Sequence, residues 1–149
     1  MKKLTTLNLG CGHDYIKGAT NLDISANVGA DIVCDITGGI PFENNSFDII
    51  IVNNVLTQIQ LPKRFIFVMN ELWRVSRGEV QIRVPNAKHI CSWQDPMDVR
   101  RFTDQTFTYM EGGHRRYEQY GKHYGFRPWK VKLISDNGRQ MKFKLKPIK

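Results

Sequence analysis

The segment Phe47–Val52, with the sequence FDIIIV, carries apolar side chains at consecutive positions rather than at alternate ones. A strand with one face in water alternates apolar and polar residues. A strand inside a parallel sheet is covered by helices on both faces, so it reads as a continuous apolar run. We therefore predict that 47–52 is a central strand of a mostly parallel sheet, covered on both faces, in an α/β fold.

Short apolar segments alternate with turn residues in the chain around this strand. We expect strands at Leu4–Leu9, Ala19–Ile24 and Asp31–Cys34 before it, and another at Glu79–Val84 after it. The connections between the first three strands are shorter than the dozen or so residues that a helical crossover usually needs. The N-terminal helices of this α/β fold are therefore expected to be reduced.

Apolar residues recur on one helical face over 61–77 and predict a helix. Pro62 suits its first turn, and Gly78 is the expected end. A second helical segment is expected over 114–124, with Gly125 as its stop. Between the two, a short helix is expected from a cap at Thr103 through about Met110.

The C-terminal segment predicts an antiparallel hairpin. The runs WKVKLIS and RQMKFKLK flank Asn137-Gly138, which is a strong turn signal between two strands. The alternation of residues places one apolar set inward, namely Val131, Leu133, Met141, Phe143 and Leu145. It leaves a set of lysines outside, namely Lys130, Lys132, Lys142, Lys144 and Lys146.

Positive charge is concentrated in the same segment. The net charge is +8; residues 1–121 hold 13 basic and 13 acidic residues, whereas residues 122–149 hold nine basic residues and one acid. Rows of lysine bind phosphates in proteins that recognise nucleic acid. They also keep edge strands from associating, which is the interpretation that we favour. An anionic partner stays open, and nucleic acid is the less favoured of the partners considered.

The length of 149 residues predicts one domain over 1–149. The chain has no apolar stretch near the roughly 18–20 residues of a membrane span and no cleavage signature after its basic start, so we expect a cytoplasmic protein without a membrane partner. The cysteines are odd in number and lack CxxC spacing, so we expect small buried thiols and no metal site. They are Cys11, Cys34 and Cys91.

Glycine and polar residues follow the ends of the first four expected strands: Gly10, Cys11 and Gly12; Asp23; Asp35; and Asn53 and Asn54. The carboxyl ends of parallel strands line one crevice, so these residues are expected to converge on one ligand. The glycine turn lets a ligand approach backbone amides, and Asp23 can accept from both hydroxyls of a ribose. Asp35 can accept from an exocyclic amine, with Ile24 and Ile36 against the base. The pattern predicts a nucleoside-shaped site.

Three stretches together resemble the class I S-adenosylmethionine-dependent methyltransferases, particularly the small methyltransferase-11-like branch: LNLGCGHDYIKGATNLDIS, DIVCDITGGIPFENNSFDIIIVNNVLTQI and FVMNELWRVSRGEVQIRVPN. The resemblance implies a Rossmann-like fold, S-adenosylmethionine as cofactor, and methyl transfer to an unidentified O or N acceptor. It also implies roles for the residues above. Gly10, Cys11 and Gly12 would line the methionine part, Asp23 would hold the ribose, Asp35 and Ile36 would flank the adenine, and Asn53, Asn54 and Val55 would close the site.

The chain departs from that family at several positions. The family often has an acid where Asn8 stands, a histidine near Thr57 or Gln58, and a DPxHxR motif whose histidine is missing from DPMDVR here. A hydroxyl acceptor needs a base to take its proton. The candidates for this base are Asp95 and His114, and also His123.

Two other functions stay open. One is a non-catalytic nucleic-acid-binding or scaffold module on a degenerate methyltransferase fold. The other, weaker one is a nicotinamide-dinucleotide enzyme, although Tyr15 replaces the third glycine of its motif and Asp23 comes too early for it. With no separate substrate domain expected, the site is shallow, completed by a second subunit in a homo-oligomer, or open to a large acceptor.

Overall fold

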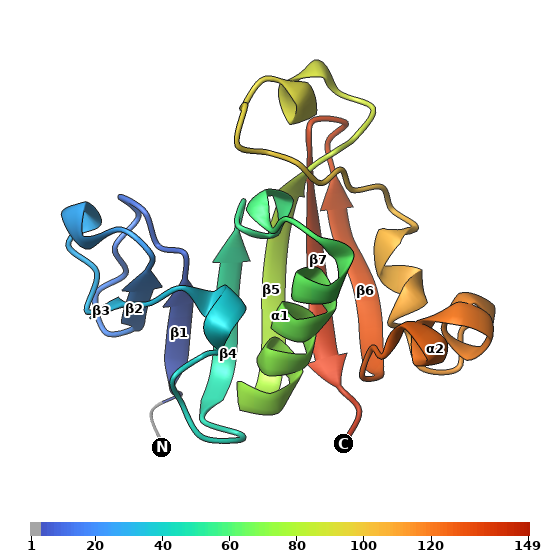
Figure 1. Cartoon of the computed structure of the whole chain (residues 1–149), viewed down its shortest axis with the longest axis horizontal. Helices are drawn as coiled ribbons and strands as arrows, with labels where there is room; N and C mark the ends of the chain where they lie inside the picture. Colours follow the sequence, from blue (N-terminus) through green and yellow to red (C-terminus); the bar gives the residue numbers. More distant parts are fainter. Residues whose placement is uncertain (1–3) are drawn as a thin grey trace.

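The computed structural model describes residues 4–149 and contains one seven-stranded sheet in the order β3-β2-β1-β4-β5-β7-β6 (Figure 1). The strands are β1 (Thr6–Leu9), β2 (Thr20–Asp23), β3 (Ile32–Val33), β4 (Phe47–Asn53), β5 (Ser76–Pro85), β6 (Trp129–Asp136) and β7 (Gln140–Pro147). Strands β1 to β5 run parallel, and β7 is antiparallel to both of its neighbours. The predicted mostly parallel sheet with an antiparallel C-terminal hairpin is confirmed, although the first three strands are shorter than expected.

Helix α1 (Pro62–Val75) is the longest helix among the described residues. A π-helical turn, η6 (Tyr117–Gly121), continues into α2 (Lys122–Tyr124), and Gly125 ends this segment in the left-handed region, as predicted. The helix expected after Thr103 is only the single 3-10 turn η5 (Thr106–Tyr109). Other single turns are η1 (Ala26–Val28), η2 (Ile36–Gly38), η3 (Leu56–Gln58) and η4 (Ile90–Trp93). None of the helices in residues 4–149 is long and apolar enough to cross a membrane.

The end of α1 differs from the prediction. The helix stops at Val75, and the chain enters β5 directly at Ser76, so Gly78 lies inside a strand. A Cβ at Gly78 would lie 2.1 Å from the carbonyl oxygen of Asp48 in β4. Glycine is needed there because two backbones approach closely, and not because a helix ends.

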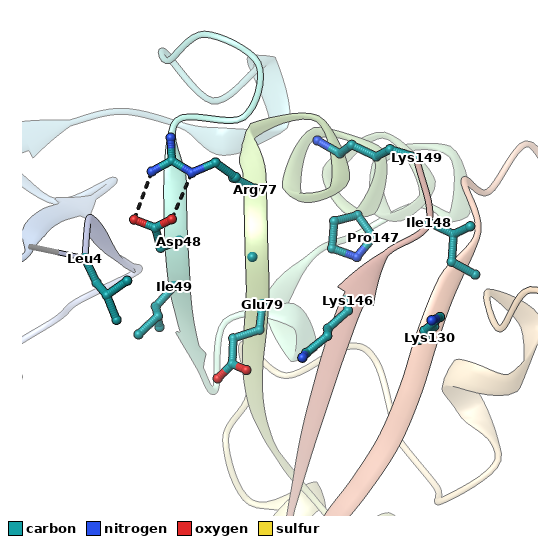
Figure 2. Close-up of a pocket in the computed structure, with 11 residues that line it drawn as sticks. Leu4, Asp48, Ile49, Arg77, Glu79, Lys130, Lys146, Pro147, Ile148 and Lys149 are labelled. Atoms are coloured by element: carbon teal, nitrogen blue, oxygen red, sulfur yellow. Dashed lines mark hydrogen bonds and ion pairs between the residues drawn. The ribbon is translucent and has the colours of Figure 1, made fainter. Parts of the chain in front are cut away.

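A two-point ion pair fixes the same junction. The guanidinium of Arg77 donates from Nε to Oδ1 of Asp48 at 2.8 Å and from Nη2 to Oδ2 at 2.9 Å (Figure 2). These bonds from Arg77, followed by the backbone N–H of Thr5, hold the pKa of Asp48 well below its usual range. The amino-terminal ends of β4 and β5 are therefore joined by side chains as well as by the strand ladder.

The hydrophobic core lies between α1 and one face of the sheet. Five residues of α1 are buried there: Phe65, Val68, Met69, Leu72 and Val75. They belong to the same cluster as alternate residues of the strands, including Leu7, Leu9, Ile50, Val52, Val80, Ile82, Met141, Phe143 and Leu145. The two periods, 3.6 for the helix and 2 for the strands, bring these side chains together.

The opposite side of strands β4 to β6, here called the open face, carries the other alternate residues. Ile49 and Ile51 of β4 are only half-buried, and two cavities of about 730 Å³ and 430 Å³ hollow this face. Its other side chains are Asn53; Glu79, Gln81 and Arg83; Lys142, Lys144 and Lys146; and Lys130 and Lys132. Figure 2 views this face at the amino-terminal ends of β4 and β5, with α1 behind the strands. The predicted cover of β4 on both faces is therefore wrong, because the short N-terminal connections supply no helix for this side.

A polar network takes the place of the helix between β1 and β2. Asn8 is buried and donates from Nδ2 to the carbonyl oxygen of Asp14 at 2.8 Å and to Oδ1 of Asn21 at 2.9 Å. Asp31 accepts from the backbone and side chain of Asn21 and from the hydroxyl of Tyr15, and these bonds lower the pKa of Asp31. A carboxylate at position 8 has no proton to donate, which explains the amide there.

The C-terminal hairpin has the predicted antiparallel pairing. One side chain that was expected to face the core is exposed. Met141 and Phe143 are buried as expected, but Leu133 is 42% exposed. The pairing slips between Leu133 and Ser135, and β6 is the edge strand. Leu133 still pairs with the buried Phe143, so its exposure follows from its place on the edge strand and not from a change of face.

Candidate functional site

A cavity of about 460 Å³ opens at the carboxyl ends of β1, β2 and β4. Eight of the predicted cofactor residues line it: Gly10, Gly12, Asp23, Ile24, Asp35, Ile36, Asn54 and Val55. Its other lining residues are Leu22, Cys34, Thr37, Gln58, Ile59 and Met97. We call it the carboxyl-edge cavity. Segments far apart in the sequence meet here because the parallel strands all end at this edge.

The glycine turn after β1 makes room at the floor of this cavity. Gly10 and Gly12 both have positive φ, at 65° and 49°. A Cβ at Gly10 would lie 2.3 Å from Cγ2 of Val55, whereas a Cβ at Gly12 meets nothing within 4 Å. The amides of Gly10 and Cys11 donate to the carbonyl of Leu22, at 2.8 Å and 3.0 Å. Glycine at position 10 is therefore needed for the close packing of Val55, and the open space lies beside Gly12. The amides of the turn are bonded to Leu22 and Asp23, and are not free as the sequence suggested.

Asp23 ends β2 with its carboxylate held by two backbone donors. Oδ2 accepts from the N–H of Gly12 at 2.8 Å, and Oδ1 accepts from the N–H of Ser25 at 2.9 Å. An ionised carboxylate has about four acceptor positions. Both oxygens thus keep capacity for further donors, in a geometry that the backbone has already set.

A second carboxylate stands beside two exposed apolar side chains. Oδ1 of Asp35 accepts from the hydroxyl and the N–H of Thr37, at 2.7 Å and 2.9 Å, and these bonds lower the pKa of Asp35. Ile24 and Met97 also line the cavity, and they are 67% and 60% exposed. Two large apolar side chains in this position suit a flat apolar ring between them. Met97 was not among the residues expected at the site, although Asp95 in the same loop was expected there as a candidate base.

The three cysteines differ in burial and in whether they line the carboxyl-edge cavity. Cys34 lines the cavity and Cys11 does not, and burial raises the pKa of both thiols, so they stay protonated. Only Cys11 is fully buried, whereas Cys34 and Cys91 are partly exposed.

Asn53 lines the 430 Å³ cavity of the open face, because successive side chains of β4 point to opposite faces.

Asn54 directly follows the carboxyl-terminal end of β4 and turns the chain there, with a positive φ of 55°. Non-glycine residues in this region are often found at functional sites. Asn54 and Gln58 line both the carboxyl-edge cavity and a neighbouring cavity of about 280 Å³. Asp95 lines that smaller cavity, and its Oδ1 accepts from the N–H of Met97 at 2.9 Å. The two cavities therefore adjoin, with Asn54 and Gln58 at their boundary.

Thr57 stands near the place where the resembling family often has a histidine. It is buried, and its hydroxyl donates to Oδ1 of Asp98 at 2.6 Å. Its carbonyl oxygen accepts from the N–H groups of Val99 and Arg100, both at 2.9 Å. Thr57 thus anchors the loop that carries Asp95 and Met97 over the cavities.

His114 and His123 are not brought to this edge. The chain just before His114 pairs at Glu111 with Trp129, the first residue of β6, and Trp129 pairs with Pro147 near the amino-terminal end of β5. Nδ1 of His114 accepts from the N–H of Arg116 at 3.1 Å. His123 is exposed, and it belongs to α2, which lies beside β6 (Figure 1). Neither histidine lines the carboxyl-edge cavity or the smaller one beside it.

The same fold is found in solved methyltransferase structures at low sequence identity. One from Thermotoga maritima, described as an S-adenosylmethionine-dependent methyltransferase and possible histamine N-methyltransferase, is 11% identical with a TM-score of 0.65, covering 99% of this chain and 84% of its own. Another, from Methanosarcina mazei, is 14% identical with a TM-score of 0.63, covering 100% and 95%. A third, from Aquifex aeolicus, is 13% identical with a TM-score of 0.62, covering 97% and 82%.

No protein-family model and no curated protein matches the sequence. The similarity to known proteins is therefore structural, and at these identities it concerns the fold. The strand order and the C-terminal antiparallel hairpin agree with it. The chain has the fold of the S-adenosylmethionine-dependent methyltransferases over nearly its whole length.

Proposed function

We propose that the chain is an S-adenosylmethionine-dependent methyltransferase with its cofactor in the carboxyl-edge cavity. The observation that carries the proposal is the convergence there of the glycine turn, Asp23, Asp35 and the exposed pair Ile24 and Met97. The volume of about 460 Å³ is within the range of small-molecule sites, about 300–1,000 Å³. The fold supports the same cofactor class.

The roles follow from the contacts of each residue. The carboxylate of Asp23 accepts from the two ribose hydroxyls through the capacity that Gly12 and Ser25 leave unused. Asp35 accepts from the exocyclic amine of adenine, and Ile24 and Met97 hold the ring. The open space beside Gly12, with Gly10 next to it in the lining, would receive the methionine part of the cofactor.

Bound in this way, S-adenosylmethionine supplies a methyl group on a positively charged sulfur. Much of the acceleration of such a displacement comes from holding the acceptor in line with the methyl group. Asn54 and Gln58 lie at the boundary of the two cavities and orient an O or N acceptor that enters the smaller one. For a hydroxyl acceptor, Asp95 is the group in that cavity which takes the proton.

Binding measured by calorimetry tests the cofactor assignment. We expect S-adenosylhomocysteine and S-adenosylmethionine each to bind with a stoichiometry of one molecule per chain. We also expect the two ligands to compete for the same site. We expect no heat with NADH, because the third glycine of a dinucleotide motif is absent. If NADH gave heat and neither methionine-derived ligand did, the result would support the dinucleotide alternative. No heat with either methionine-derived ligand would remove the proposed function.

One observation favours a second candidate function, nucleic-acid binding on the open face. Edge protection explains the lysines of β6, but Lys142 and Lys146 lie on β7 and Arg83 on β5, inside the sheet. Lys144 pairs with Glu79 at 3.0 Å; no other lysine of this face makes an ion pair with a described residue. Figure 2 shows Lys130 and Lys146 on neighbouring strands, on the same side. Unpaired cations on adjacent strands suit a phosphate backbone.

Salt-dependent binding of a fluorescent DNA duplex or RNA hairpin tests this second function. Replacing Lys132, Lys142 and Lys146 together by glutamine should reduce the slope of log K against log salt by about 0.9 for each phosphate that the protein no longer neutralises. The control variant replaces Lys63, Arg64 and Lys88, which lie off the open face, with the same change in charge. An equal reduction in both variants, or no binding at low salt, would contradict a nucleic-acid site on this face.

A further inference from the structure

A cavity of about 540 Å³ lies outside the candidate site, between the start of α1 and the segment 100–126. Its buried lining is apolar and consists of Phe65, Met110 and Phe126. Its other lining residues are Pro62, Lys63, Ile66, Arg100, Thr106, Tyr109 and Tyr124. No lining residue is acidic, and two are cations. We call it the Arg100 cavity.

The guanidinium of Arg100 lacks a partner in this cavity. It lies 4.2 Å from the centre of the Phe65 ring, and it makes no hydrogen bond or ion pair with any of the described residues 4–149. Its Nε is buried without an acceptor. Burial lowers the pKa of Arg100, and no carboxylate opposes that effect. The side chain as a whole is half-buried, and a partly desolvated charge is costly unless it is paired.

Some other arginines of the chain, unlike Arg100, have a hydrogen-bond or ion-pair partner for the guanidinium group. Arg101 also has a buried Nε without an acceptor, but it donates from Nη1 to the carbonyl of Asp98 at 2.6 Å. Arg116 donates from Nη1 to Oε1 of Gln105 at 2.7 Å. Arg74 on α1 is paired with Glu71. Arg100 has only the ring of Phe65, although its backbone N–H is fixed to the carbonyl of Thr57 at 2.9 Å. Its position is therefore set by the fold, while its side chain keeps its donors free.

We propose that the Arg100 cavity binds a small organic carboxylate with an aromatic body. A carboxylate matches the planar donor fork of a guanidinium through two parallel hydrogen bonds. The body of the ligand contacts Phe65 and Phe126, and the rings of Tyr109 and Tyr124 form the rim. The hydroxyls of both tyrosines make no hydrogen bond with the described residues, so they are also available to the ligand. This site does not depend on the function proposed for the carboxyl-edge cavity.

The Arg100 cavity and the carboxyl-edge cavity are lined by neighbouring residues of the same two chain segments, but they share no lining residue. Thr57 accepts from Val99 and Arg100, while Met97 and Ile59, on the same two segments, line the carboxyl-edge cavity. A change at Arg100 therefore alters carboxylate binding without removing any residue that lines the cofactor site.

Titration with indole-3-acetate and phenylacetate, followed by amide chemical shifts, tests the proposal. Shifts are expected at residues 62–66, 100–110 and 124–126. Indole-3-acetamide, which has the same body without the charge, should bind at least about tenfold more weakly, because a hydrogen bond to a charged group is lost. Arg100→Gln should weaken indole-3-acetate binding to a similar extent, and the matched variant Arg64→Gln should leave it unchanged.

Two further measurements make the result decisive. The thermal midpoint of Arg100→Gln should equal or exceed that of the wild type, because a half-buried charge without a partner is removed, whereas a purely structural arginine would lower it. The affinity for S-adenosylhomocysteine should be the same in both proteins, which separates this site from the cofactor site. Equal binding of the amide and the acid, no shifts at these residues, or binding of phenyl phosphate but not of carboxylates would overturn the proposal.

Discussion

Replacing Gly78 with alanine is expected to lower the free energy of unfolding by about 3 kcal/mol or more, in the range of severe overpacking. The new Cβ would lie 2.1 Å from the carbonyl oxygen of Asp48 and 3.2 Å from its Cα. These are backbone atoms, held on both sides by the pairs Phe47↔Ser76 and Ile49↔Glu79, so they cannot move aside cheaply. Equilibrium denaturation measured by circular dichroism gives the value.

Gly38→Ala is the control for this prediction. A Cβ at Gly38 meets nothing within 4 Å, and its φ is not in the left-handed region. We expect a change within about 0.5 kcal/mol, as for other surface substitutions. If Gly78→Ala cost no more than the roughly 1 kcal/mol typical of propensity changes, the close approach of β4 and β5 at this point would be contradicted.

Replacing Asp23 with alanine is expected to weaken the binding of S-adenosylhomocysteine by about 100-fold. The substitution removes two hydrogen bonds to a charged acceptor, each worth about 1.5 kcal/mol or more, and tenfold in affinity corresponds to about 1.4 kcal/mol. It also removes the acceptors for Gly12 and Ser25, so the glycine turn loses its support. Calorimetry measures the affinity.

Two companion variants separate binding from folding. Asp23→Asn keeps a side chain of the same shape with one acceptor oxygen, so the loss of affinity should be smaller and the fold unchanged. Asp104→Ala removes an exposed acid that lies outside the cavity and should leave affinity as in the wild type. Unchanged affinity in Asp23→Ala, with wild-type unfolding behaviour, would show that the carboxylate does not hold the ribose.

Much of the architecture was predictable because the signals are local. The period of apolar residues marked α1 within two residues of its end, and Asn137-Gly138 marked the hairpin. Polar residues after successive strands predicted a crevice at one sheet edge, since parallel strands carry their carboxyl ends to the same side. Eight of the ten residues expected around one ligand do line a single cavity.

Other features had no local signal. Gly78 looked like a helix stop, since a glycine after a helical run has that meaning in most sequences. The contact that requires it belongs to Asp48, about thirty residues earlier in the chain. Asn53 looked equivalent to Asn54, but the pleat of β4 points it to the open face. His114 was a candidate base, but its segment packs at the start of β6.

The order of strands and turns in the sequence determined the sheet, its carboxyl edge and the place of a nucleoside-sized cavity, because periodicity and turn chemistry act over a few residues. Only tertiary packing decided which side chains enter that cavity, which face of β4 is left uncovered, and that Arg100 has no hydrogen-bond or ion-pair partner among the described residues. These depend on the distances between segments such as 57–63 and 95–101, whose contacts the one-dimensional pattern does not contain.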